Sequence, residues 1–198
     1  MTTKHMWLLI AASVASIGTS CSDSGGSGTP TLPPAEQTPT PPLATSTLPL
    51  ELDVTNTGSV VINELLAKND TINVDEAEQN DDWLELYNRG SDAVDVSGWT
   101  LSDDPQDEEP WAIPDGTVIA SGDFLLIWCD EDEDDGPLHA SFKLGAEGEQ
   151  ITLRDASGDV AERLTFGALE ADIAWGRLVD GGDDFGQLAP SPASSNGS

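Results

Sequence analysis

Residues 82–103 read DWLELYNRGSDAVDVSGWTLSD, and they give the strongest indication of the fold in this chain. Apolar residues recur at every second position around Leu84 and again around Val94. A period of two is typical of a β-strand with one buried face. Between the two runs, residues 88–92 supply Asn, Gly, Ser and Asp, which tolerate a left-handed backbone or hydrogen-bond back to it. The stretch therefore predicts two strands joined by a reversal of the chain.

The chain after residue 58 continues in the same manner. Short strand-like runs are separated by Gly, Pro, Asp and Asn, and no run has a sustained helical period. This organisation predicts an all-β sandwich. The expected core residues are Leu84, Leu86, Val94, Val96, Leu101, Ile113, Val118, Leu125, Ile127, Phe142, Leu144, Ile151, Leu153, Leu164 and Phe166. Five tryptophans of this region are expected to pack in or beside the core, with a carbohydrate-stacking platform as the alternative: Trp83, Trp99, Trp111, Trp128 and Trp175.

These motifs resemble those of the lamin tail domain, an immunoglobulin-like β-sandwich also found in secreted bacterial proteins. The clearest are WLELYN at 83–88 and VDVSGWTLSD at 94–103. Further runs that fit the family occupy 60–65, 113–119, 122–128, 138–144, 150–155 and 190–196. We therefore expect residues 58–198 to form such a domain. The resemblance implies a binding module, because domains of this family commonly accompany secreted or surface enzymes.

The N-terminus has the layout of a secretory signal. A lysine precedes an apolar run at 6–17, and three small residues at 18–20 lead to Cys21. This arrangement resembles a bacterial lipobox, although Gly18 stands where leucine is usual. Residues 1–20 are thus expected to be a lipoprotein signal peptide, and Cys21 to carry the lipid. The other interpretation is an ordinary signal peptide with an incidental thiol nearby.

The segment 21–57 changes in composition. Ser-Gly repeats give way to prolines and threonines, with few bulky apolar residues. Such a segment cannot bury enough surface to offset the entropy lost on ordering. We expect a disordered, lipid-anchored tether. The expected location is the bacterial cell envelope, either at the outer membrane, on its periplasmic face, or at the cell surface.

The charge balance limits the partners. Asp and Glu number 37 against seven Lys and Arg, giving a formal net charge of −30. A nucleic-acid-binding surface is excluded, because neutralising phosphates requires clustered cations. The expected partners are the membrane, through the N-terminal lipid, and a protein or polysaccharide at the cell surface. No small-molecule substrate is expected.

The densest acidic run, residues 130–135, is followed by Gly136. Alternate carboxylates on a loop with a tight turn can converge on Ca²⁺. The EF-hand pattern fails, because the position for its bidentate glutamate is occupied by Phe142. The candidate calcium ligands are Asp130, Asp132, Asp134 and Asp135, and the alternative is a solvated, self-repelling loop. No other cofactor is expected.

Two glutamates, Glu64 and Glu85, stand in expected strands where polar residues are unusual. Structural hydrogen bonds, to the amide of Asn63 or Asn88 or to backbone N–H groups, are one explanation. The other is an acid and base pair for glycoside hydrolysis, which requires a separation of about 5 to 9.5 Å.

Enzyme motifs are otherwise missing from the sequence. The expected domain contains one histidine, His139, two residues before Ser141, without the buried acid and oxyanion donors of a hydrolase. Cys129 ends an apolar run and is expected to be a packed thiol. We therefore expect a non-catalytic, lipid-anchored interaction module of the envelope. The alternatives are a structural lipoprotein acting as an acidic spacer and, third, a carboxylate-based hydrolase.

Overall fold

The computed structural model describes residues 58–197, which contain β-strands and no helix. The expected signal peptide at 1–20, Cys21 and the expected tether at 21–57 lie outside the described residues. Within residues 58–197 there is no helix of a length and hydrophobicity that would let it cross a membrane. The predicted all-β fold is confirmed.

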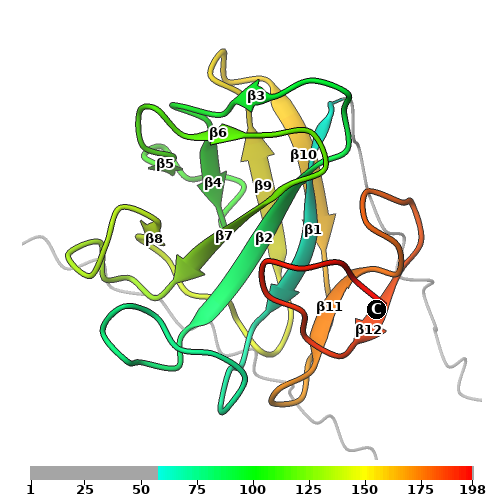
Figure 1. The fold of residues 1–198 in the computed structure, drawn as a ribbon. Helices are drawn as coiled ribbons and strands as arrows, with labels where there is room; N and C mark the ends of the chain where they lie inside the picture. The colour runs from blue at the N-terminus through cyan, green and yellow to red at the C-terminus, as the bar shows by residue number, and fades with distance from the viewer. Residues whose placement is uncertain (1–57, 198) are drawn as a thin grey trace, which may run out of the picture. The chain divides into compact units, whose positions relative to one another are not determined.

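The described residues form three sheets (Figure 1). The large sheet has the order β12-β11-β1-β2-β7-β8, the second β10-β9-β4-β5, and a two-stranded ribbon joins β3 to β6. The strands are β1 (Val60–Leu66), β2 (Asp82–Asn88), β3 (Val94–Asp95), β4 (Thr100–Ser102), β5 (Trp111–Ala112), β6 (Val118–Ile119), β7 (Phe124–Cys129), β8 (His139–Ala140), β9 (Gln150–Arg154), β10 (Val160–Thr165), β11 (Ala174–Arg177) and β12 (Phe185–Leu188). All pairings are antiparallel except that of β7 with β8.

The main core is built from the large sheet and the four-stranded sheet. On β2, alternation sends Leu84 and Leu86 into this core, while Trp83 belongs to a second cluster with Leu66 and Trp128. The large sheet is therefore covered on parts of both faces, which explains why every residue of β1 is buried. This is the immunoglobulin-like sandwich expected from the sequence.

Most of the expected core residues are buried, with three exceptions. Val118 is 55% exposed, and Val94 and Leu125 are half-buried. Val94 and Val118 lie in the β3–β6 ribbon, where Ile119 points inward and its neighbour Val118 outward. The sequence prediction was wrong for Val118, because alternation within a two-residue strand gives too little pattern to fix which face is buried.

All five tryptophans follow the packing prediction. Trp83, Trp111 and Trp128 are buried, and the half-buried Trp99 and Trp175 pack against the main core.

A β-bulge in β1 places the polar residues of that strand. The register to β2 shifts between Ile62 and Glu64, so that Asn63 is the extra residue. Ile62 and Leu65 both face the main core, although an unbroken strand would send residues three apart to opposite faces. Because of the shift, Glu64 lies directly opposite Glu85 of β2.

Candidate functional site

Two groups of buried carboxylates lie at different places in the domain. The first forms where the loop between β1 and β2, residues 67–81, meets the segment after β7. The second lies on β1 and β2, where the C-terminal segment 191–196 bonds to both strands.

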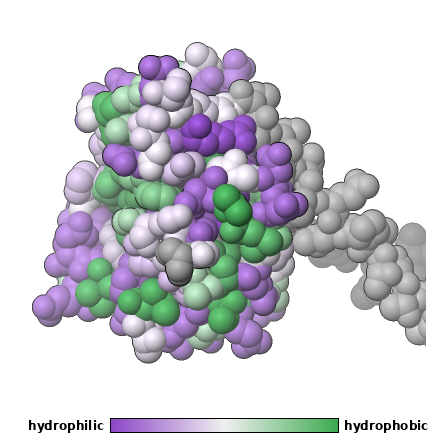
Figure 2. Space-filling view, turned by 45° about the vertical axis from the view of Figure 1, so that its right-hand side comes forward, coloured by the Kyte–Doolittle hydropathy of each residue, from purple (hydrophilic) through white to green (hydrophobic). Residues whose placement is uncertain are grey.

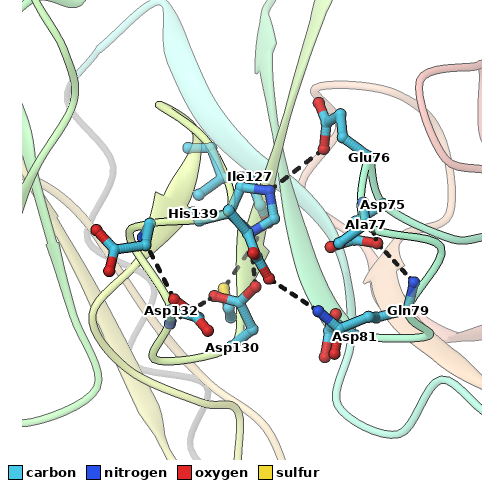
Figure 3. Close-up of polar contacts among 12 residues, drawn as sticks. Asp75, Glu76, Ala77, Gln79, Asp81, Ile127, Asp130, Asp132 and His139 are labelled. Carbon is cyan, nitrogen blue, oxygen red and sulfur yellow. Dashed lines mark hydrogen bonds and ion pairs between the residues drawn. The ribbon is translucent and has the colours of Figure 1, made fainter.

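His139 is the centre of the first group (Figure 3). It opens β8, whose parallel pairing places it opposite Trp128, two residues before Asp130. The imidazole is 1% exposed, its Nδ1 lies 2.5 Å from Oδ2 of Asp130, and its Nε2 lies 3.3 Å from Oε2 of Glu76. Gly136 permits this position, since a Cβ there would stand 2.9 Å from the His139 ring.

Opposing effects set the proton affinity of His139. Burial lowers the pKa of the imidazole, but hydrogen bonds and charge from Asp130 and Glu76 outweigh this and raise its pKa above the ordinary value. The histidine is thus held between two carboxylates that favour a positive charge between them.

Asp75 completes the group. Its side chain is 8% exposed, and its Oδ1 accepts hydrogen bonds from the N–H groups of Ala77 and Gln79, at 3.0 and 2.6 Å. Its Oδ2 is buried and has no hydrogen-bond donor. One ligand atom from each of Asp75, Asp130 and His139 lies within 4.8 Å of the others, and among residues 58–197 this is the one set of three such side chains that could hold a metal ion. We call these three residues the His139 cluster.

The surroundings of the His139 cluster are strongly acidic. The Oδ2 atom of Asp81 is also buried without a donor, and burial, followed by the charges of Asp130 and Asp75, raises the pKa of Asp81. Burial likewise raises the pKa of Asp82 to about 6. Buried carboxylates are therefore more numerous here than the groups that could neutralise them.

The acidic run singled out in the sequence is divided by the structure. Asp130 is buried and belongs to the His139 cluster, whereas Asp132, Asp134 and Asp135 do not. Asp132 accepts a hydrogen bond from the N–H of Asp134 at 3.3 Å, and Asp135 accepts one from the side chain of Gln79 at 2.8 Å. Calcium binding by the four residues together stays a prediction.

The second group joins Glu64 and Glu85 to the C-terminal segment. Both side chains are fully buried. Glu64 accepts hydrogen bonds from the N–H and hydroxyl of Ser191 at 2.9 and 2.8 Å. Glu85 accepts from the amide of Asn63 at 3.3 Å and from the N–H of Ala193 at 2.6 Å. We call Asn63, Glu64, Glu85 and residues 191–196 the C-terminal clamp.

The clamp confirms the structural explanation of the two glutamates, including the expected bond to Asn63. Burial, the largest effect, raises the pKa of Glu85 to about 8 and outweighs its hydrogen bonds to Asn63 and Ala193. Burial also raises the pKa of Glu64. Each of the four carboxylate oxygens nevertheless has a protein donor.

A third buried carboxylate, Glu162 on β10, lies beside the clamp. It forms an ion pair with Arg177, and both side chains are 0% exposed. Its other oxygen accepts a hydrogen bond from the N–H of Ile62 at 2.5 Å. The amide of Asn196, in the clamp, donates to the carbonyl of Arg177 at 2.7 Å. Strands and C-terminal segment are thus joined by one polar network.

Sequence reasoning missed Asp75 as a site residue and treated His139 only as a poor hydrolase candidate. The two residues lie 64 positions apart, with no ligand-spacing motif between them. A usable signal was the coincidence of the single domain histidine with an adjacent acidic run.

A family model described as Lamin Tail Domain matches residues 53–168, more than half of the 198-residue chain. The strands β11 and β12 lie beyond the matched residues, and β11 pairs with β1 in the large sheet. No curated protein matches the chain.

Proposed function

We propose that this chain, which belongs to the lamin tail domain family, is a non-catalytic interaction module. It is exported and is held at the bacterial cell envelope by a lipid on Cys21. The partner is a protein or polysaccharide at the cell surface. The chain is strongly acidic, with a formal net charge of −30. Figure 2 displays a face on which hydrophilic residues surround smaller apolar areas.

The observation that carries the non-catalytic part is the C-terminal clamp. Glu64 and Glu85 were the carboxylate pair suited to acid and base work, but all four of their oxygens accept hydrogen bonds from the protein itself. A general acid or base must reach the substrate's proton within hydrogen-bond distance. Side chains that are 0% exposed and bonded to the C-terminal segment support a structural role instead.

Anchoring is tested first. The full-length protein is expected to incorporate a labelled fatty acid and to partition into the detergent phase, whereas Cys21→Ala should abolish both. A Ser27→Ala variant, in the expected tether, is a matched control that leaves Cys21 and residues 18–20 unchanged. Continued labelling of the Cys21→Ala variant would contradict lipid attachment at this residue.

A structural envelope lipoprotein, acting as an acidic spacer, is the second candidate. It is favoured by the excess of Asp and Glu, 37 against seven Lys and Arg. Carboxylates at this density hydrate a surface and repel other acidic surfaces.

Site-specific photocrosslinking in intact cells separates the two functions. Val118 and Val179 are 55% and 70% exposed, so a photoreactive residue at either position should leave the fold intact. An interaction module is expected to give one discrete adduct, which disappears in the Cys21→Ala variant. A spacer gives no discrete adduct at either position, and its deletion causes an envelope defect.

A further inference from the structure

We propose that Asp75, Asp130 and His139 bind a divalent first-row metal ion, with Zn²⁺ as the best-fitting representative. The site goes beyond the proposed function, and its existence does not depend on the lipid anchor or on the partner. Its ligands are one imidazole nitrogen and two carboxylate oxygens, from the β1–β2 loop, the end of β7 and the start of β8.

The geometry requires only small movements. The three ligand atoms lie within 4.8 Å of one another. Zinc ligands about 2.1 Å from the ion in a tetrahedral arrangement lie about 3.4 Å apart. The Asp130 and His139 atoms, now 2.5 Å apart, would separate by roughly an ångström, and the Asp75 oxygen would approach them by at most about 1.4 Å.

The second, independent observation is the oxygen of Asp75 that has no donor. Its Oδ1 is fixed by two backbone N–H groups, so the direction of Oδ2 is fixed as well. A buried carboxylate oxygen without a donor is unfavourable, and native proteins satisfy nearly all such atoms. A metal ion supplies the missing partner.

Glu76 can accept a hydrogen bond from His139 and orient its ring, as a carboxylate commonly does for a metal-bound histidine. When Nε2–H of His139 donates to Glu76, the tautomer is set and the lone pair of Nδ1 is left for the ion. Nδ1 is the nitrogen that faces Asp130. The ring is therefore oriented as metal-binding histidines usually are.

The charges also favour a cation. The negative charges of Asp130 and Asp75 both act on Asp81, and the cations that act on Asp81 are Lys143 and His139. A divalent ion neutralises two of these negative charges where water is excluded. Imidazole suits zinc and its first-row neighbours, whereas Ca²⁺ and Mg²⁺ prefer oxygen ligands alone. Zinc is therefore favoured over the calcium suggested by the acidic run.

The test is a Zn²⁺ titration of the full-length chain against a chromophoric chelator, with melting recorded at each step. Asp75→Asn is the decisive variant, because its Oδ1 still accepts from Ala77 and Gln79 while the ligand oxygen becomes an NH₂ group. We expect one zinc site, weakened at least tenfold in this variant. Asp132→Asn, on the exposed part of the acidic run, is the matched control and should bind as the wild type does.

The same titration with Ca²⁺ and Mn²⁺ identifies the class of ion. Calcium is expected to bind more weakly than zinc and to raise the melting temperature less. Equal zinc affinity in the wild type and Asp75→Asn would overturn the proposal. So would a loss of binding in Asp132→Asn but not in Asp75→Asn, since this would place the site on the acidic loop.

Discussion

The C-terminal clamp and the His139 cluster both bury carboxylates, yet they satisfy them differently. In the clamp, Glu64 and Glu85 use all four oxygens to accept hydrogen bonds from the protein. In the His139 cluster, Asp75 and its neighbour Asp81 each keep a buried oxygen that has no donor. The two regions belong to the same domain. They differ in whether the protein supplies a hydrogen-bond donor for each buried carboxylate oxygen.

This difference separates structural from ligand-binding carboxylates. Burying a charged group is costly unless hydrogen bonds or an opposite charge compensate it. The clamp supplies that compensation by folding residues 191–196 over β1 and β2, so its glutamates hold the C-terminus in place. The His139 cluster lacks enough donors, and the proposed metal ion would correct this imbalance.

The largest effect is expected beside the clamp, at Glu162. Glu162→Ala leaves the fully buried Arg177 without its ion-pair partner and the N–H of Ile62 without an acceptor. Removing one member of a buried pair costs about 3 to 5 kcal/mol. Denaturant unfolding should show this loss, while Glu108→Ala, at an exposed position, should change stability by less than about 0.5 kcal/mol. A loss below about 1 kcal/mol would mean that the pair does not hold the network together.

Glu85 should make stability depend on pH. Its folded-state pKa is raised to about 8 from an ordinary value of 4.5, so the folded protein holds a proton there that the unfolded chain releases. The stability gained from this bound proton is fully present below about pH 4.5 and is lost as the pH rises toward 8 and beyond. The free energy of unfolding should therefore fall over this window, and less steeply in Glu85→Gln.

The pH dependence of the free energy of unfolding is compared between the wild type and Glu85→Gln, with zinc chelated throughout. Asp82 and Glu64 also have raised pKa values, so a reduced slope remains in the variant. Identical slopes for the wild type and Glu85→Gln would show that Glu85 is not the buried acid described here.

The smallest expected effect is an increase in stability, and it concerns Asp81, beside the His139 cluster. Asp81→Asn removes a negative charge that Asp130 and Asp75 repel, and it replaces an unsatisfied buried oxygen with an NH₂ group that can donate a hydrogen bond. In chelator, the variant should be more stable than the wild type by about 0.5 to 1.5 kcal/mol, the net value of one hydrogen bond. Asp134→Asn, which is exposed, is the matched control. A destabilised Asp81→Asn protein would show that the aspartate already has adequate partners.

Much of the fold could be predicted, because long strands have many alternating positions. On β2, Leu84 and Leu86 enter the main core as their period of two predicts. Val118 was predicted wrongly, since the two-residue strand β6 has no such redundancy. The bulge at Asn63 could not be predicted either, although it places Glu64 opposite Glu85.

The C-terminal clamp and the His139 cluster also differ in how far the sequence predicts them. The clamp was partly predictable, because a glutamate in an apolar strand implies a buried bond, and Asn63 donates to Glu85 on the neighbouring strand. The His139 cluster was not, because Asp75 reaches it through a loop whose path no local pattern fixes. The acidic run supplied Asp130, but the parallel pairing of β8 with β7 is what places His139 against it.

The most direct test of the metal site observes His139 itself. The chain has two histidines, so in a His5→Gln protein the imidazole ¹⁵N resonances belong to His139 alone. Long-range ¹H–¹⁵N spectra are recorded with and without one equivalent of Zn²⁺. With the proposed zinc site, Zn²⁺ is expected to shift the Nδ1 resonance to the metal-bound range while Nε2 keeps its proton toward Glu76. Unchanged His139 resonances in zinc-saturated protein would contradict it.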